Sequence, residues 1–167
     1  MIRLAIAFLG ALMLPLPALA QNASPAPLPA QVTFFSSGKT LLMLPGSRAA
    51  FVGKVFDEHR ELALLGRRRF ITFNLDPGIH VLSSNWWLTT GPAGGTHLTI
   101  DLVVGIHYYI SESFEEVGLG GSKIIMKEVT CEAAQQANVD TKPLERKHLG
   151  RDGITAAPAQ ATFPPCQ

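Results

Sequence analysis

The chain has 167 residues, 47% of them hydrophobic, and its 14 Lys and Arg residues nearly balance 13 Asp and Glu residues. This length is that of one ordinary domain and is sufficient to bury a hydrophobic core. The charge balance argues against binding to nucleic acid, because proteins that grip a phosphate backbone rely on a surplus of Lys and Arg.

The first 20 residues have the pattern of a secretory signal peptide. Arg3 precedes an apolar run over residues 4–14, and the small side chains of Ala18 and Ala20 predict cleavage before Gln21. The alternative, an uncleaved membrane helix, needs about 20 apolar residues, whereas the unbroken run here has 11. Gln21 is not the Cys that a bacterial lipid anchor requires. We therefore expect an exported protein, periplasmic or extracellular, that is not a lipoprotein and has no stable membrane insertion after cleavage.

Both ends of the remaining chain differ in composition from its middle. Residues 21–31 and residues 150–167 are rich in Pro, Ala and polar side chains, without periodic apolar spacing. Such composition predicts flexible arms. The folded domain is accordingly expected over residues 32–149.

The middle of the chain contains short runs rich in Val, Ile, Thr, Phe and Tyr between Gly and Pro residues, which is typical of strands. In residues 69–75 the apolar side chains of Ile71, Phe73 and Leu75 alternate with polar ones, as expected for a strand with one buried face. The other expected strands are residues 32–35, 39–44, 49–57, 79–85, 97–104, 106–112 and 123–129. Together they predict two packed antiparallel sheets.

Two turns are expected to close hairpins between these strands. Asp76, Pro77 and Gly78 supply an acceptor side chain, a fixed φ and tolerance of positive φ, which a reversal of the chain requires. Gly105 marks a second reversal, between the strands on either side of it.

Two features suggest recognition. Arg67, Arg68 and Arg69 form a dense basic cluster, which is either a solvated hairpin tip or a contact for an anionic surface polymer. Trp86 and Trp87 follow a strand, so one indole should face outward and offer a flat apolar surface to a sugar ring or a partner side chain. In the alternative interpretation both Trp residues pack in the edge of the sandwich, because Trp is highly buried on average.

Cys131 and Cys166 are the two cysteines of a chain that is expected in an oxidising compartment. We favour an intramolecular disulfide, with an intermolecular bridge or a free thiol at Cys166 as the alternatives. Cys131 lies in residues 130–138, a short helix-like polar segment that follows the last expected strand and contains no His. A catalytic cysteine therefore has no local support.

Three stretches of the chain resemble a known family: residues 53–82 (GKVFDEHRELALLGRRRFITFNLDPGIHVL), residues 98–113 (LTIDLVVGIHYYISES) and residues 123–129 (KIIMKEV). Their order of strands and turns resembles the DUF2846 domain of bacterial envelope proteins, which is related in pattern to PEGA-type modules. The resemblance implies a small β-sandwich outside the cytoplasm and carries no activity that transfers to named positions. The fold class expected is thus all-β, a small antiparallel sandwich of immunoglobulin or PEGA type, with a short helical segment after the last strand.

The sequence carries only weak signals of catalytic chemistry. The five histidines lack the tight spacing of zinc ligands, so His80 and His107 are interpreted as outward-facing strand residues. The G-x-S-x-G pattern of a nucleophilic Ser is absent. Residues 118–123 resemble a phosphate-binding loop but precede a strand instead of a helix. No enzymatic activity and no cofactor or metal are expected.

Three functions remain as hypotheses. The preferred one is an exported non-catalytic module that docks on an envelope protein or a cell-wall polymer. The second is a carbohydrate- or peptidoglycan-binding protein that uses Trp86, Trp87 and the arginine cluster. The third is a hydrolase or metal enzyme built from scattered His and Glu residues.

Overall fold

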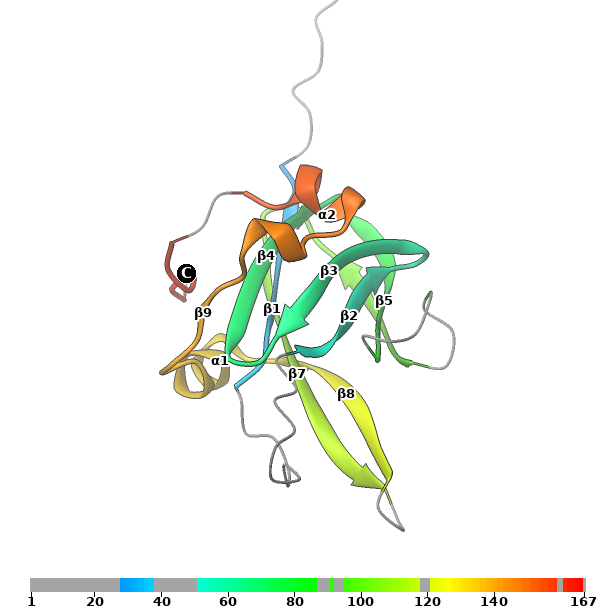
Figure 1. Ribbon diagram of the computed structural model, residues 1–167. Coiled ribbons are helices and arrows are strands. Elements are labelled where there is room, and N and C mark those ends of the chain that lie inside the picture. Colours follow the sequence, from blue (N-terminus) through cyan, green and yellow to red (C-terminus); the bar gives the residue numbers. More distant parts are fainter. Residues whose placement is uncertain are drawn as a thin grey trace, which may run out of the picture.

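The computed structural model describes residues 28–37, 51–86, 91, 95–117, 121–158 and 161–166, and Figure 1 shows two sheets flanked by short helices. No helix within these ranges is long and apolar enough to cross a membrane. The elements are β1 (Ala30–Phe35), β2 (Phe51–Asp57), β3 (Arg60–Gly66), β4 (Arg69–Leu75), β5 (Gly78–Asn85), β6 (Thr96–Leu102), β7 (His107–Val117), β8 (Gly121–Val129), α1 (Cys131–Ala137), β9 (Lys142–Pro143), the 3-10 helix η1 (Arg146–His148) and α2 (Arg151–Ala156).

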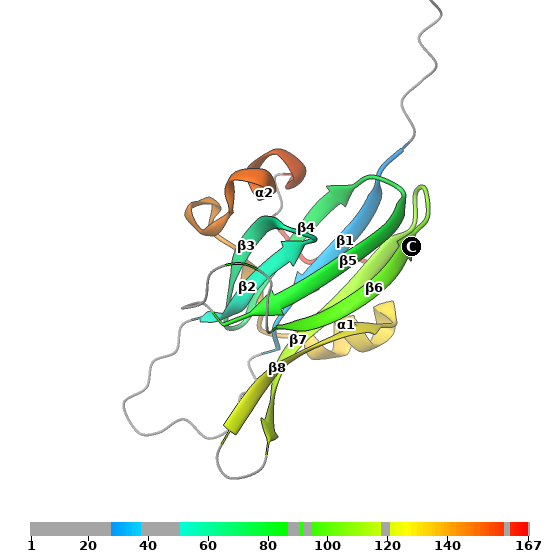
Figure 2. The ribbon, with the colours of Figure 1, turned by 90° about the vertical axis from the view of Figure 1, so that its right-hand side faces the viewer.

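The strands form a five-stranded sheet in the order β8-β7-β1-β4-β9 and a four-stranded sheet in the order β3-β2-β5-β6. The all-β sandwich with a short helix after its last long strand is therefore confirmed. Two pairs differ from the antiparallel expectation, because β1 pairs with β7 and β4 pairs with β9 in parallel. For β1 and β7, the strands between them include those of the four-stranded sheet, and β7 then returns to the five-stranded sheet to lie parallel to β1 (Figure 2).

The expected hairpin at Asp76, Pro77 and Gly78 is a turn of another kind. The chain does reverse there, and Gly78 has a φ of +131°, but β4 belongs to the five-stranded sheet and β5 to the four-stranded one. The turn thus joins the two sheets instead of two paired strands. Alternation identifies the buried face of a strand and leaves its partner open, which is why the hairpin prediction was wrong.

The second expected hairpin, around Gly105, is wrong for the same reason. β6 ends in the four-stranded sheet and β7 begins in the five-stranded sheet. The link is a turn in which the N–H of Ile106 donates to the carbonyl of Val103 at 3.1 Å and Gly105 has a φ of +72°. Ile100 and Leu102 of β6 lie in the core, whereas Val104, beyond the end of the strand, is exposed.

The main hydrophobic core fills the space between the two sheets. Phe34 of β1 and Phe73 of β4 meet there edge to face, with ring centroids 5.9 Å apart. Val55 of β2, Leu82 of β5 and Ile110 of β7 also belong to this core. In β4, for example, Ile71, Phe73 and Leu75 belong to this core, because every second residue of a strand points to the same face.

The other face of the five-stranded sheet is covered by α1 and by residues 161–166, which we call the C-terminal tail. Phe163 of the tail packs on a buried cluster that includes Phe35, Phe70 and Tyr109. The predicted disulfide between Cys131 and Cys166 is present.

The segment that was expected to be a flexible arm, residues 150–167, therefore contains the helix α2 and a packed tail. Phe163 and the bonded Cys166 hold the described tail, residues 161–166, against the sheet despite the composition of this segment. At the other end, β1 begins at Ala30, within the expected flexible arm of residues 21–31. The expected strand over residues 39–44 lies outside the described residues.

The helix α2 contacts β3 and β4 at the side of the sandwich. The N–H of Gly150 donates to the carbonyl of Leu62 at 2.8 Å, and Leu149 forms an isolated bridge with Ala63. Glycine is required at Gly153, because a Cβ there would overlap the backbone of Leu62. These contacts place the chain after η1 directly along the β3 edge.

The disulfide should contribute a large share of the stability of the fold. Replacing both cysteines in a Cys131→Ala/Cys166→Ala variant opens a loop with a sequence separation of 35. The chain-entropy model then predicts a loss of about 3 to 4 kcal/mol in the free energy of unfolding, which urea denaturation measures. The wild-type chain in a thiol reductant is the matched control and should show a similar loss. Equal stability of the oxidised and reduced chains would contradict this prediction.

Candidate functional site

A cleft opens where the end of β5 and the start of β6 meet β8. Its volume is about 240 Å³, and we call it the Trp86 cleft. Figure 2 shows the hairpin of β7 and β8 extending past this end of the sandwich. The lining residues are Ser84, Asn85, Trp86, Gly95, Thr96, Lys123 and Ile124.

Close contacts between strands shape the Trp86 cleft. β5 and β6 begin their pairing at Ser84 and Thr96, and the Thr96 hydroxyl donates to the backbone carbonyl of Ile124 on β8. Gly53 of β2 lies behind them, where a Cβ would come within 2.6 Å of the Asn85 carbonyl oxygen. The same Cβ would come within 2.7 Å of the Ile124 side chain on β8 of the other sheet, so the absence of a side chain at Gly53 lets the two sheets approach each other at this end.

Trp86 forms one wall of the cleft and has an exposed fraction of 37%. Its indole lies beside the ring of Phe114, with centroids 5.2 Å apart. The backbone N–H of Trp86 donates to the side-chain oxygen of Asn85 at 2.9 Å, and the Asn85 amide donates to the Gly91 carbonyl at 3.1 Å. Trp87 lies outside the described residues. The structure thus presents one supported, partly exposed indole beside several polar groups.

Glu112 is buried beside the Trp86 cleft, with an exposed fraction of 1%. One carboxyl oxygen accepts a hydrogen bond from the hydroxyl of Ser84, which lines the cleft. The other oxygen has no partner among the described residues. Burial raises the pKa of Glu112 to about 7, and the Ser84 bond opposes this shift. Glu112 is therefore poised to change its protonation state near neutral pH.

Glu112 was not predicted as a site residue, although the sequence pattern of β7 contains it. Tyr108 and Ile110 face the main core, and a period of two places Glu112 next on the same face. An acidic residue on the buried face of a strand was the available signal.

The arginine cluster does not contribute to the Trp86 cleft, whose described lining contains no arginine. Arg68 is exposed at the turn between β3 and β4 with a φ of +52°. Arg69 donates to the carbonyl of Pro143 at 3.2 Å and forms an ion pair with Glu145 at 3.5 Å. Arg69 thus attaches the segment around β9 to the sandwich, while Arg67 lies half-buried in the same turn.

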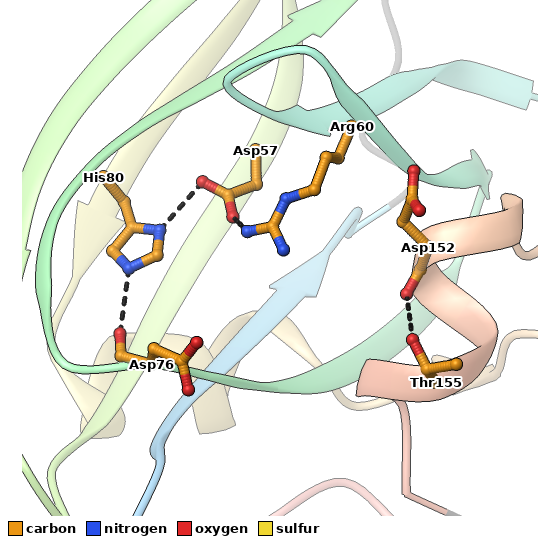
Figure 3. A network of polar contacts seen from close by, with 6 residues as sticks. All are labelled: Asp57, Arg60, Asp76, His80, Asp152 and Thr155. Carbon is orange, nitrogen blue, oxygen red and sulfur yellow. Dashed lines mark hydrogen bonds and ion pairs between the residues drawn. The ribbon is translucent and has the colours of Figure 1, made fainter.

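A second polar network surrounds Asp57, which is fully buried (Figure 3). Its two carboxylate oxygens bind the guanidinium of Arg60 and Nδ1 of His80, the latter at 2.8 Å. Nε2 of His80 lies 2.8 Å from the carbonyl oxygen of Asp76. The interpretation of His80 as an outward-facing residue was therefore wrong, because its side chain is only 11% exposed.

Both ring nitrogens of His80 lie within hydrogen-bond distance of oxygen atoms of the protein. A catalytic base needs a ring nitrogen that is available to a substrate. The geometry instead makes His80 a clamp that ties the turn at Asp76 to the end of β2.

His107 is half-buried as well, which corrects its interpretation as an outward-facing residue. Its Nε2 lies 2.7 Å from the hydroxyl of Thr33, which in turn lies 2.5 Å from the hydroxyl of Thr72. Burial lowers the pKa of His107. His107 also stacks on Tyr109 with centroids 4.5 Å apart. Within the described ranges, no three His, Cys, Asp or Glu residues gather as metal ligands would.

Comparison of the chain with family models, with curated proteins and with solved structures found no match. The likeness to the DUF2846 domain is thus a prediction that rests on the sequence pattern.

Glu112 should make the stability of the protein depend on pH. Its ordinary pKa of 4.5 applies to the unfolded chain, while burial raises the folded value to about 7. Between these values the folded state retains a proton that the unfolded state has lost. The free energy of unfolding should therefore fall by the order of 3 kcal/mol as the pH rises through this window, and level off above it.

A Glu112→Gln variant tests this effect, because it retains the acceptor for Ser84 and cannot ionise. Urea denaturation from pH 4 to pH 8 should show a flatter profile for the variant than for the wild type, with the variant more stable at pH 8. Glu128→Gln, at an exposed position on β8, is the matched control and should follow the wild-type profile. Parallel profiles for Glu112→Gln and the wild type would refute the assignment.

The Asp57 network should be structural. An Asp57→Ala substitution leaves the largely buried His80 without its carboxylate partner, and the loss of such a hydrogen bond costs about 1.5 to 3 kcal/mol. Thermal or urea unfolding measures the loss. Glu58→Ala changes the exposed neighbouring acid and should leave stability within about 0.5 kcal/mol of the wild type. A small effect at Asp57 would mean that the clamp is dispensable.

Proposed function

We propose that this protein is an exported, non-catalytic β-sandwich module that binds a component of the cell envelope through the Trp86 cleft. Export is supported by the signal-peptide pattern of residues 1–20 and is compatible with the disulfide between Cys131 and Cys166. Disulfides persist in oxidising compartments, where an exported protein resides.

The observation that carries the proposal is the composition of the Trp86 cleft. Trp86 offers a partly exposed aromatic face, and the Lys123 ammonium and the Thr96 hydroxyl oxygen, which line the same cleft, suit a ligand rich in hydroxyl groups. Such a combination of one aromatic wall and several polar groups is typical of a small ligand site. A carbohydrate chain of the cell wall is the ligand class that fits it best.

A non-catalytic role is supported by how the reactive groups near the cleft are used. The Ser84 hydroxyl donates to Glu112, whose carboxyl group is sealed from solvent. Lys123 pairs with Glu115 at 3.3 Å. The Ser84 hydroxyl, as a nucleophile, and the Glu112 carboxyl group, as an acid, are thus held by internal partners. Ligand binding needs only the exposed surfaces of the cleft.

The test is retention on purified cell wall. The wild-type chain should be retained, and Trp86→Ala should reduce its affinity about tenfold or more, as expected for an aromatic anchor. Trp86→Phe retains an aromatic face and should keep most of the binding. Val139→Ala changes a residue that is 83% exposed and is the control. Retention that is equal for Trp86→Ala and the wild type, or no retention of the wild type, would refute carbohydrate binding at this cleft.

A further inference from the structure

A second recognition surface lies on the opposite face of the five-stranded sheet, away from the main core. We call it the aromatic patch, and its members are Phe35 of β1, Phe70 of β4, Tyr109 of β7 and Ala134 of α1. The four residues come from four different elements and are all buried under the C-terminal tail.

Phe163 of the tail is the side chain that fills the aromatic patch. Its ring meets Phe35 and Phe70 edge to face, with centroid distances of 5.6 Å and 5.2 Å. It also stacks on Tyr109 at 5.9 Å. Three ring contacts on one side chain make Phe163 the anchor of the tail, since aromatic pairs of this geometry contribute beyond the area they bury.

Side-chain donors bind the backbone carbonyl groups of the two residues after Phe163. The Gln135 amide donates to the carbonyl of Pro164 at 2.6 Å, and the Tyr109 hydroxyl donates to the carbonyl of Pro165 at 3.1 Å. Proline has no backbone N–H, so this segment offers only acceptors. The side chains of Gln135 and Tyr109 supply two donors for these acceptors, next to an aromatic surface.

This combination is the chemistry by which proteins recognise extended proline-containing segments, namely aromatic contacts to the segment and donors to its carbonyl groups. We infer that the aromatic patch is a recognition site for an extended aromatic-proline-proline segment. In the isolated chain the site is filled by residues 163–165 of the same chain. The same chemistry suits such a segment of a partner protein.

The disulfide decides which segment occupies the site. Cys166 follows Pro165 directly and is bonded to Cys131 at the start of α1. A tethered segment has a high effective concentration, so the chain's own tail excludes a free peptide while the bond is intact.

Exchange with a dithiol opens the tether. The dithiol loses two electrons and two protons and becomes a disulfide, while the sulfurs of Cys131 and Cys166 each gain one electron and one proton and become thiols. The tail then stays attached through the backbone on its N-terminal side alone, so its effective concentration at the patch falls and a partner segment competes with it more readily. This site is independent of the Trp86 cleft, so either proposal can fail without the other.

The experiment uses the full-length chain with the site vacated by Cys131→Ser, Cys166→Ser and Phe163→Ala. The probe is a fluorescent peptide with the sequence ATFPPSQ, which copies residues 161–167 with Ser in place of Cys. Fluorescence anisotropy should show saturable binding to this variant with a dissociation constant below about 1 mM, the limit for a gain of about 4 kcal/mol. The oxidised wild-type chain should not bind the probe.

Two controls separate recognition from nonspecific adhesion. A peptide with Ala in place of Phe should not bind the vacated chain. Adding Tyr109→Phe retains the ring and removes one donor, which should weaken binding about threefold to tenfold, as expected for the loss of one hydrogen bond. Circular dichroism confirms that each variant is folded.

A second arm uses the wild-type chain treated with dithiothreitol and does not depend on the triple variant. Reduction should create binding of the probe, and reoxidation should abolish it. The inference is overturned if the folded vacated chain does not bind the probe below about 1 mM, or if the reduced wild-type chain binds it no better than the oxidised chain does. It is also overturned if the Phe-to-Ala peptide binds equally well.

Discussion

Strand β1 lies between β4 and β7, so its alternate side chains enter two different hydrophobic layers. Phe34 faces the four-stranded sheet, and the adjacent Phe35 faces α1 and the tail. The central strands can exist only if both layers form, because exposing either face would place large aromatic rings in water. Three consequences depend on this constraint: the sandwich, the packed C-terminal tail and the aromatic patch beneath it.

The sequence predicted the faces of the strands better than their partners. Period-two spacing at Ile71, Phe73 and Leu75 correctly identified a buried face, but alternation carries no information about pairing, so two turns between sheets were taken for hairpins. β3 was not predicted as a strand, since its Glu, Leu and Ala residues favour helices. Tertiary contacts with β2 override that local preference.

The candidate sites were harder to predict because their members are far apart in the chain. Trp86 was recognised from its type and position, yet the cleft beside it requires β8 to approach β5, which no local pattern encodes. Phe163 was overlooked in a Pro- and Ala-rich segment, and the disulfide was the one signal that this segment is held against the domain. The composition of a segment is an average over its residues, and it does not show that one anchored ring, that of Phe163, can hold the C-terminal tail against the domain.

The contact between the chain after η1 and strand β3 has a consequence for solubility. β3 is the outermost strand of its sheet, and such an edge carries unpaired backbone groups that can template the addition of another chain. Leu149 and Gly150 occupy some of these groups at Ala63 and Leu62, and α2 stands in front of the rest of the strand. The chain thereby blocks growth of the sheet at its β3 edge, a protection against fibrillar self-association that is built from its own final third.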